Sequence, residues 1–201
     1  MVDNKKRIIE KNRKLVIVGD GMCGKTCLLY SFVYNTFDSN HTPTIFDTYA
    51  ASVQVEDKKI TLTLFDTAGQ EDFDRLRPLS YNDTNIVLIC FNIDNQTSAK
   101  NVTEKWYPEI HHYCATCPII LVGCKKDLRT DLVTITDSTE NCKQMLSIED
   151  GKRLAAQIHA DVYMECSAKT GEGVQDLFFH AAHLSLEKRS RQSTHHRCLL
   201  H

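Results

Sequence analysis

The chain has 201 residues, 42% of them hydrophobic, which is enough to bury the core of one α/β domain with short appendages. Its formal net charge of −2 at pH 7 argues against a general nucleic-acid-binding protein. The charge is uneven, because basic residues gather in residues 1–14 and again from Lys188 onward, with an acidic body between them. Basic ends on an acidic body favour attraction to an anionic membrane surface.

The nine cysteines are odd in number and lack the spacing of a disulfide framework. The N-terminus is charged rather than apolar and does not resemble a secretory signal. We therefore expect reduced thiols and a cytosolic protein. The longest apolar runs, Ile86–Phe91 and Ile119–Val122, have the length of core strands, so membrane contact is expected to need an added lipid.

Short apolar runs alternate with helical stretches along the chain. Strands are predicted at Leu15–Val18, Ile60–Phe65, Ile86–Phe91 and Ile119–Val122, with an edge strand at Ala51–Val55 and a short last strand at Val162–Glu165. Helices are predicted at about Lys25–Asn35, Ser98–Tyr113, Ile148–His159 and Val174–Arg189. The alternation predicts an α/β fold, a six-stranded and mostly parallel sheet with helices on both faces. In such a fold the functional loops lie at the carboxyl ends of the strands.

The first predicted strand leads into a glycine-rich loop that opens a helix. Its residues are Gly19, Asp20, Gly21, Met22, Cys23, Gly24, Lys25 and Thr26, which fit the pattern G-x4-G-K-T. The glycines let backbone N–H groups surround phosphate oxygens at a helix N-terminus. Lys25 is expected to reach the β- and γ-phosphates, and the Thr26 hydroxyl is expected to ligate Mg²⁺. A chance glycine turn is the alternative, and the strand and helix on either side make it the weaker one.

A second segment, Asp66-Thr67-Ala68-Gly69-Gln70, follows the strand Ile60–Phe65 and emerges at the same edge of the sheet. The Asp66 carboxylate is expected to hold Mg²⁺ through water. The Gly69 N–H can meet the γ-phosphate, and Gln70 can orient an attacking water molecule.

Two later segments predict a guanine pocket. Asp127, in Cys124-Lys125-Lys126-Asp127, can accept hydrogen bonds from guanine N1–H and the 2-amino group, which adenine lacks. The Lys125 stem can cover the base. Cys166-Ser167-Ala168-Lys169 follows the last strand and can offer backbone N–H groups to guanine O6.

These four segments, in this order, resemble the Ras superfamily of small GTPases, a P-loop NTPase fold, and more narrowly the Rac/Cdc-like branch of the Rho family. Further matching runs are Pro43–Asp47, Asp66–Tyr81, Lys105–Glu109 and Pro118–Gly123, and the resemblance covers about residues 14–190. The stretch from about Asp131 to Met145 matches the helical insert of Rho proteins in length. The resemblance implies three parts: an N-terminal extension expected to be disordered (1–13), a GTPase domain (14–187, insert about 131–145) and a basic tail (188–201).

The resemblance also implies roles for single residues. Thr44 would join Mg²⁺ and the γ-phosphate, Phe37 would pack against guanine, and Gln70, Lys25 and Gly21 would form the catalytic set, with an arginine finger supplied by a partner. The implied nucleotide contacts are Gly19, Asp20, Gly21, Met22, Cys23, Gly24, Lys25, Thr26, Cys27, Phe37, Thr44, Asp66, Gly69, Cys124, Lys125, Asp127, Ser167, Ala168 and Lys169. The implied metal ligands are Thr26, Thr44 and, through water, Asp66. The implied switch and effector residues are His41, Thr42, Pro43, Ile45, Phe46, Asp47, Tyr49, Phe73, Leu76 and Leu79.

The family further implies a membrane-associated GDP/GTP switch with Mg²⁺ as cofactor. Its partners would be exchange factors, GTPase-activating proteins, a GDP-dissociation inhibitor and effectors such as kinases with Rac/Cdc-binding motifs. Actin organisation, cell polarity and vesicle-related pathways are the processes that the family implies. The expected location is the cytoplasmic face of the cell membrane, with a cytosolic pool.

Three residues depart from the family pattern. Cys124 replaces an Asn or Thr that fastens the base loop to the phosphate loop, and a thiol is a weaker hydrogen-bonding group. His41 replaces a tyrosine over the phosphates, and Met22 is bulky where the branch has a small residue. Fast nucleotide exchange is therefore the hypothesis, and a mostly GTP-loaded scaffold with little regulated hydrolysis is the alternative function.

Other cysteines have possible roles of their own. Cys198 is fourth from the end in Cys198-Leu199-Leu200-His201, the pattern of a prenylation site, although a terminal His is outside the usual set. Cys27 is a candidate redox thiol because a helix N-terminus lowers thiol pKa values. The group His111, His112, Cys114 and Cys117 has ligand-like spacing, but one short segment rarely supplies a whole zinc site.

Overall fold

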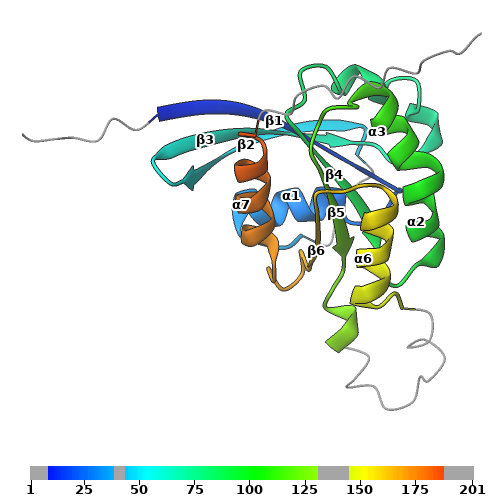
Figure 1. The fold of residues 1–201 in the computed structure, drawn as a ribbon. Coiled ribbons are helices and arrows are strands. Elements are labelled where there is room, and N and C mark those ends of the chain that lie inside the picture. Colours follow the sequence, from blue (N-terminus) through cyan, green and yellow to red (C-terminus); the bar gives the residue numbers. More distant parts are fainter. Residues whose placement is uncertain (1–8, 39–43, 131–144, 188–201) are drawn as a thin grey trace, which may run out of the picture.

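The computed structural model describes residues 9–38, 44–130 and 145–187. In these residues six strands form one sheet in the order β2-β3-β1-β4-β5-β6 (Figure 1). The strands are β1 (Ile9–Gly19), β2 (Phe46–Val55), β3 (Lys58–Thr67), β4 (Ile86–Asn92), β5 (Ile119–Cys124) and β6 (Val162–Cys166). Only the edge pair β2–β3 is antiparallel; the other neighbouring strands in this sheet run parallel. The predicted α/β fold with a mostly parallel sheet is therefore confirmed.

Helices cover both faces of the sheet (Figure 1). On one face, α1 (Lys25–Tyr34) and α7 (Val174–Leu184) pack together, and the Phe32 and Phe178 rings stack with centroids 3.9 Å apart. On the other face lie α2 (Gln96–Asn101), α3 (Tyr107–Tyr113) and α6 (Ile148–Gln157) around the fully buried Trp106. The two resulting cores fix the sheet between them.

The central strands are buried along their whole length, as their uninterrupted apolar sequences predict. Each residue of β4 and β5 is buried. Parallel strands that are covered on both faces read as continuous hydrophobic runs because neither face meets water. The carboxyl ends of β1, β3, β4, β5 and β6 consequently lie at one edge of the sheet, where the candidate site residues follow them.

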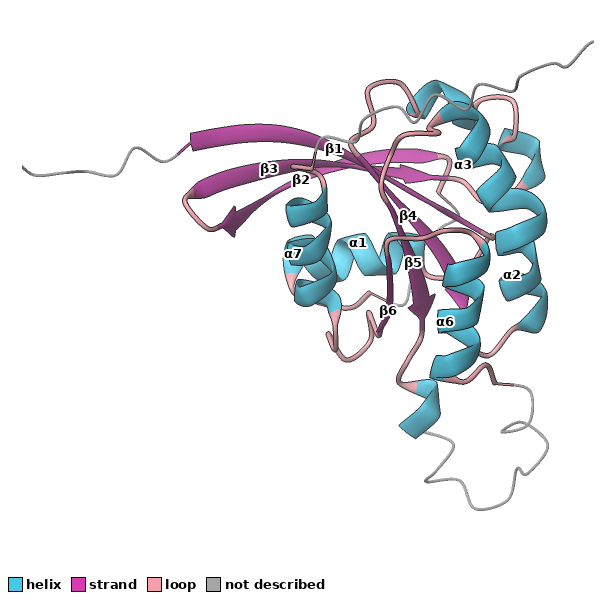
Figure 2. Cartoon of the chain, in the orientation of Figure 1, coloured by secondary structure: helices cyan, strands magenta, loops and turns pink. Residues whose placement is uncertain are grey.

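The N-terminal part of the sheet differs from the prediction. Strand β1 begins at Ile9 rather than at Leu15, and its residues 9–17 pair with β3 from Lys58 to Asp66. The expectation of a disordered extension over residues 1–13 is therefore wrong for residues 9–13, and residues 1–8 lie outside the described part. The reason is pairing: the polar residues at the start of β1 extend the hairpin arm of β2 and β3, which Figure 2 shows projecting beyond the helices.

The predicted helices are present with adjusted ends. The stretch predicted as one helix from Ser98 to Tyr113 is helical from Gln96 to Tyr113. Its middle part, Val102–Trp106 (η3), is a π-helix between α2 and α3. Helix α7 ends at Leu184, before the predicted end at Arg189. Most of the predicted insert, residues 131–144, lies outside the described residues. Among the helices that the structure describes, none combines the length and apolar character needed to cross a membrane.

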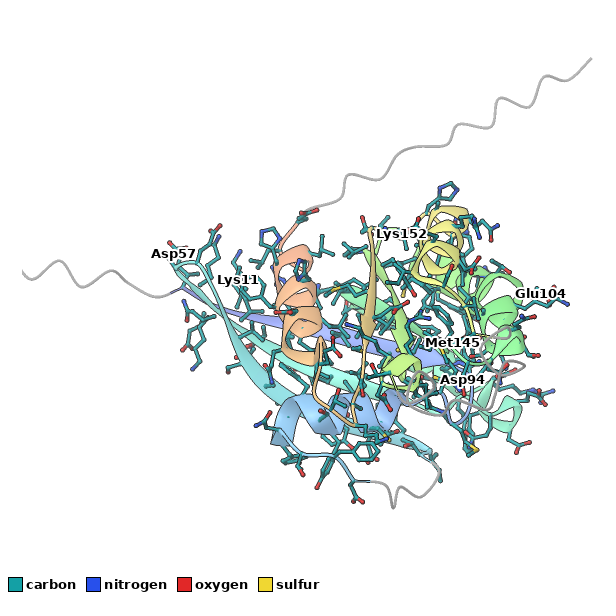
Figure 3. The ribbon with its side chains drawn as sticks, turned by 90° about the horizontal axis from the view of Figure 1, so that it is seen from below. Lys11, Asp57, Asp94, Glu104, Met145 and Lys152 are labelled. Atoms are coloured by element: carbon teal, nitrogen blue, oxygen red, sulfur yellow. The ribbon has the colours of Figure 1, made fainter. Side chains whose placement is uncertain are left out.

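The described segment that begins at Met145 lies beside the carboxyl end of β4. The Leu146 N–H donates to the Ile93 carbonyl oxygen at 2.8 Å, and Figure 3 shows Met145 close to Asp94. In the same view Lys11 and Asp57 lie at the opposite end, on the β1–β3 arm. The arm thus points away from the edge that carries the candidate site.

Candidate nucleotide-binding site

The glycine-rich loop joins the end of β1 to the start of α1, as predicted. Gly24 has φ of 103° and Gly19 has φ of 145°, and an added Cβ at Gly19 would lie 2.2 Å from the Cys90 carbonyl oxygen. Lys25 is only 6% exposed, and its ammonium donates hydrogen bonds to the carbonyl oxygens of Gly19 and Asp20, each at 2.8 Å. The loop therefore holds a buried cation at its centre, where phosphate oxygens are expected to bind.

Three oxygen-bearing side chains from separate segments meet beside this loop. The Thr26 hydroxyl lies 2.7 Å from the Thr44 hydroxyl and donates to Asp66 Oδ2 at 2.6 Å. Asp66 is fully buried, and its other carboxylate oxygen, Oδ1, has no hydrogen-bond partner among the residues that the structure describes. Burial raises the pKa of the Asp66 carboxyl, against the hydrogen bond from Thr26 and the charge of Lys25.

The two hydroxyls and the carboxylate form a set of hard oxygen donors, which is what Mg²⁺ prefers. A buried carboxylate oxygen without a partner is costly unless a cation or water completes it. The residues present therefore fit Mg²⁺, and the structure brings together all three predicted ligands, Thr26, Thr44 and Asp66.

The segment after β3 packs directly on the phosphate loop. An added Cβ at Gly69 would lie 2.4 Å from the Asp20 carbonyl carbon, the Gly19 carbonyl oxygen and the Gly21 nitrogen. Only glycine allows this approach. An added Cβ at Gly21 would lie 3.9 Å from the side chain of Gln70, so the predicted catalytic glutamine lies beside the loop.

A side-chain contact that the sequence does not reveal fixes Asp20 within the loop. Its two carboxylate oxygens accept hydrogen bonds from Trp106 Nε1 at 2.8 Å and Asn101 Nδ2 at 2.9 Å. Both donors lie at the π-helical segment η3, a helix distortion that often marks functional sites. Asp20 was predicted as a nucleotide contact, and here its carboxylate attaches the phosphate loop to the helical layer.

The predicted guanine-contacting segments meet at the ends of β5 and β6. Asp127 is 10% exposed in its side chain, accepts a hydrogen bond from the Ser167 hydroxyl at 2.5 Å, and lies 3.8 Å from the Lys169 ammonium. The Lys126 N–H donates to the Cys166 carbonyl oxygen at 3.1 Å. Lys125 has φ of 64°, which turns the chain sharply after the strand. Asp127, Ser167 and Lys169 therefore converge as the sequence predicts.

Cys124 is buried below these segments. The neighbouring thiols of Cys166 and Cys90, with the charges of Lys25 and Lys125, lower the pKa of Cys124 well below its ordinary value. An added Cβ at Gly24 would lie 3.9 Å from the Cys124 Cβ, so the base loop and the phosphate loop approach each other here. The thiol lies where the family pattern has an Asn or Thr side chain that connects the two loops.

Other predicted contacts are placed as follows. Met22 adopts φ of 61° and is 92% exposed, so its side chain extends away from the loop. Phe37 is 42% exposed. Burial raises the pKa of the Cys27 thiol, which corrects the expectation of a lowered value: the cost of burying the thiolate exceeds the effect of the helix N-terminus. His41, Thr42, Pro43 and Cys198 lie outside the described residues.

Comparisons with known proteins agree with this geometry. A family model described as the Ras family matches residues 14–187. The chain is 50% identical over 191 residues to GTP-binding protein RHO1 of Candida albicans, which covers 95% of this chain and 96% of the relative. It is 53% identical to GTP-binding protein RHO1 of Saccharomyces cerevisiae (89% of this chain, 86% of the relative) and 49% identical to Rho-related GTP-binding protein RhoB of Homo sapiens (88% and 90%). The chain belongs to the Rho family of small GTPases.

As a Rho-family GTPase the chain is an enzyme that hydrolyses GTP, and the expectation from the sequence is confirmed at this level. The relatives named above are RHO1 and RhoB proteins. The narrower placement in a Rac/Cdc-like branch stays a prediction.

The predicted effector face of this Rho GTPase is apolar and exposed. Ile45 is 66% exposed, Phe46 49%, Leu76 58% and Leu79 73%. A cavity of about 310 Å³ lies among them. It is lined by Ile45, Phe46, Phe65, Thr67, Ala68, Phe73, Leu76, Arg77, Leu79 and Ser80. Exposed apolar side chains around a cavity mark a surface for protein partners, and the sequence predicted five of these residues.

The sequence reasoning missed Arg77, which organises this face of the GTPase. Arg77 is 4% exposed. Its guanidinium donates to both carboxylate oxygens of Glu109 at 2.7 Å, to Asp74 at 2.6 Å and to the Ala68 carbonyl oxygen at 3.0 Å. It also lies over the Trp106 ring, 4.6 Å from the ring centroid. Arg77 thereby ties the segment after Asp66 to α3, and the only signal in the sequence was an arginine between apolar residues.

Proposed function

We propose that this Rho-family GTPase is a membrane-associated molecular switch whose GDP and GTP states are read at the cavity between β2 and the 3-10 helix η2 (Arg77–Ser80). The single observation that carries the proposal is the convergence of Thr26, Thr44 and Asp66 beside the buried Lys25 ammonium. Thr44 precedes the effector face and Asp66 precedes the Gly69 segment, so one phosphate group can order both loops and its loss can release them.

In this proposal the nucleotide binds across the ends of β1, β3, β5 and β6. Lys25 and the loop N–H groups bind the phosphates, and Asp127 with Ser167 and Lys169 recognises guanine. Thr26 and Thr44, with Asp66 acting through water, hold Mg²⁺, which would neutralise charge on the phosphate oxygens when bound. The remaining nucleotide contacts keep the roles implied by the resemblance: Gly19, Asp20, Gly21, Met22, Cys23, Gly24, Cys27, Phe37, Gly69, Cys124, Lys125 and Ala168.

Hydrolysis needs a positioned water molecule. Gln70 lies beside Gly21 at the edge of the phosphate loop, where its amide can orient water toward the γ-phosphate. This scheme needs no carboxylate or His side chain as a general base, because the reaction depends mainly on the position of the water molecule and on stabilisation of charge. An arginine finger from a GTPase-activating protein would supply the charge that the chain's own residues lack.

Partners and location follow from the same proposal. Exchange factors, activating proteins and a GDP-dissociation inhibitor would act on the two switch segments, and effectors, including kinases with Rac/Cdc-binding motifs, would bind Ile45, Phe46, Asp47, Tyr49, Phe73, Leu76 and Leu79. Prenylation at Cys198, with the basic tail as a second signal, would anchor the protein at the cytoplasmic face of the cell membrane and leave a cytosolic pool. Actin organisation, polarity or vesicle-related signalling would be the output.

A purified-protein assay tests the proposal. Mant-GDP should bind in a Mg²⁺-dependent manner, and single-turnover GTP hydrolysis should accelerate when a Rho-type activating protein is added. Gln70→Leu should abolish the acceleration while keeping nucleotide binding. Pull-down from cell extract with Gln70→Leu, compared with Thr26→Asn, should enrich effectors only with the former. Absence of guanine-nucleotide binding would overturn the proposal.

A second function, a fast-exchanging scaffold that stays GTP-loaded, is favoured by one observation. The Cys124 thiol, a weak hydrogen-bonding group, lies among buried cysteines at the place of the tether between base loop and phosphate loop. Rapid mant-GDP release combined with hydrolysis that an activating protein does not accelerate would favour the scaffold over the cycling switch.

A further inference from the structure

Three buried cysteines form a row across the sheet below the proposed base site. Cys90 lies near the end of β4, Cys124 ends β5, and Cys166 ends β6. None of the three is more than 4% exposed, and all belong to the apolar cluster on the face that α1 and α7 cover. Their side chains therefore point to the same side of the sheet, and the proposed hydrolysis mechanism uses none of these thiols.

The strand register distinguishes which two thiols can be joined. Cys124 and Cys166 are direct partners on neighbouring parallel strands. Neighbouring strands lie about 4.8 Å apart, and a disulfide needs Cα atoms about 4.4–6.8 Å apart. Cys90 pairs instead with Val122, two residues before Cys124, which places its Cα roughly 8 Å from that of Cys124 on the diagonal. The geometry therefore favours Cys124–Cys166 and disfavours Cys124–Cys90.

The surroundings of Cys124 make it the reactive member of the row. The neighbouring Cys166 and Cys90 thiols lower the pKa of Cys124, and the positive charges of Lys25 and Lys125 act in the same direction. The pKa of Cys166 is raised by the neighbouring Cys124 thiol and by burial. A thiol that ionises more readily than its neighbour is suited to attack an oxidant, and the neighbouring thiol can then resolve the product.

We propose that Cys124 and Cys166 form a reversible disulfide that ties together the two base-contacting segments and slows nucleotide release. The effect on release rests on the proposed guanine site, whereas formation of the bond does not. A soft-metal site is disfavoured, because in residues 9–38, 44–130 and 145–187 no group of three or more His, Cys, Asp or Glu is arranged to hold a metal.

The oxidant class is a hydroperoxide, and hydrogen peroxide is the simplest case. The Cys124 thiolate attacks one peroxide oxygen, the O–O bond breaks, and Cys124 becomes a sulfenic acid while the leaving hydroxide takes up a proton to become water. Cys166 sulfur then attacks the Cys124 sulfur, the S–O bond breaks, and a second water leaves with the Cys166 proton. Two thiols and one peroxide give one disulfide and two waters, and a dithiol reductant reverses the reaction.

The bond would act at the root of the base pocket. Cys124 is followed by Lys125 and Asp127, and Cys166 is followed by Ser167, whose hydroxyl already donates to Asp127 at 2.5 Å. In the proposed guanine site, the base is released when the segments after β5 and β6 move apart. A covalent link one residue before Ser167 restricts that opening, so oxidation is expected to lower the release rate.

The experiment uses the full-length protein loaded with mant-GDP and Mg²⁺, with and without hydrogen peroxide, followed by quenching of free thiols. Peptide mapping by mass spectrometry identifies the linked cysteines, and mant-GDP release is measured on the same samples. We expect a Cys124–Cys166 link, release slowed about tenfold, or roughly 1.4 kcal/mol in the barrier, and recovery after dithiothreitol. Cys166→Ser should lose both effects, and Cys90→Ala, the matched control in the same row, should keep both.

The outcomes separate this inference from the proposed function. The inference is wrong if mant-GDP binds but no Cys124–Cys166 link forms. It is also wrong if oxidation still slows mant-GDP release from the Cys166→Ser variant. In both cases the proposed nucleotide site is unaffected. A link that leaves release unchanged also overturns the inference. If mant-GDP does not bind the reduced protein, the proposed function fails, and the regulatory inference fails with it. Should Cys166→Ser not fold, Cys166→Ala and mapping of the wild-type protein give the same decision.

Discussion

The phosphate half and the base half of the nucleotide site are built differently. On the phosphate side, the Lys25 ammonium donates to the Gly19 carbonyl oxygen at 2.8 Å, and the Thr26 hydroxyl contacts the Thr44 hydroxyl at 2.7 Å and the Asp66 carboxylate at 2.6 Å. On the base side, Asp127 keeps a strong hydrogen bond with Ser167, but the layer below it consists of thiols. Charged hydrogen bonds are about twice as strong as neutral ones, and thiols are weaker still.

The difference implies that the rate of GTP hydrolysis and the time for which nucleotide stays bound are set by different residues of this GTPase. In the proposed function, hydrolysis depends on Gly21, Thr44 and Gln70 around the γ-phosphate, which follow the family pattern. The time for which nucleotide stays bound depends also on how firmly the base loop is attached to the phosphate loop, where Cys124 departs from that pattern. The following changes test this separation, from the largest expected effect to the smallest.

Asp127→Ala should cause the largest loss on the base side. Two hydrogen bonds to a carboxylate are worth about 1.5–3 kcal/mol each, so guanine-nucleotide affinity should fall by at least about 100-fold. The preference for GTP over ITP, which lacks the 2-amino group, should disappear. Competition against mant-GDP measures both, and Lys126→Ala, whose side chain pairs with Glu172 on the surface, is the control expected to keep the preference. A retained GTP preference in Asp127→Ala would place base recognition elsewhere.

Gly69→Ala should damage the phosphate side without changing base selectivity. Its Cβ would lie 2.4 Å from backbone atoms of the phosphate loop, so the two segments must separate. A misplacement of about 1 Å can cost about 100-fold in rate, and single-turnover GTP hydrolysis should fall by that order. Gly171→Ala is the control: its φ of +78° strains the backbone, but the added Cβ meets nothing within 4 Å, so hydrolysis should be kept. Equal hydrolysis rates in Gly69→Ala and wild type would show that the contact is dispensable.

Cys124→Thr should strengthen the base side. A hydroxyl replaces the weak thiol close to Gly24, and one recovered hydrogen bond of about 1 kcal/mol should slow GDP release five- to tenfold. The double variant with His41→Tyr should be slower still, if His41 also contributes to fast exchange. Mant-GDP release by stopped flow measures this. Unchanged release in both variants would refute the idea that these residues set exchange.

Ser147→Ala should have the smallest effect on the site and serves as a test of independence. The Ser147 hydroxyl and Asp150 carboxylate form a capping box at the start of α6, and neither residue is among the predicted nucleotide contacts. Losing it should lower the melting temperature by a few degrees and leave GDP release unchanged. A change in release would mean that exchange follows global stability rather than the base loop.

The same cap has a defined pH dependence. Hydrogen bonds from the Ser147 hydroxyl and N–H, with Arg153, lower the pKa of Asp150 to about 2. A carboxyl whose pKa is lower in the folded state stabilises the fold above its unfolded pKa, about 3.9. That contribution should fade between about pH 4 and pH 2. Melting curves of wild type and Ser147→Ala should therefore converge as pH falls through this range.

The sequence was sufficient to predict the parts whose function requires particular residue types in consecutive positions. Gly19 through Thr26 can be recognised because phosphate binding needs glycine backbone and a lysine at fixed spacing. Asp127 and Ser167 could be brought together because parallel strands end at one edge of a sheet.

The remaining features depend on contacts between distant segments. The start of β1 at Ile9 was missed because its polar residues form a strand only by pairing with β3. Asp20 with Trp106, and Arg77 with Glu109, join residues far apart in the chain, and no local pattern marks them. The thiol row required the β5–β6 register, since a shift of one residue would move Cys166 to the other face.

The most direct test measures two rates in the same three proteins: single-turnover hydrolysis of bound GTP and mant-GDP release, in wild type, Gln70→Leu and Cys124→Thr. The account predicts that Gln70→Leu stops hydrolysis and leaves release unchanged, whereas Cys124→Thr slows release and leaves hydrolysis unchanged. If each variant changes both rates together, the two halves of the site are not independent and the account is wrong.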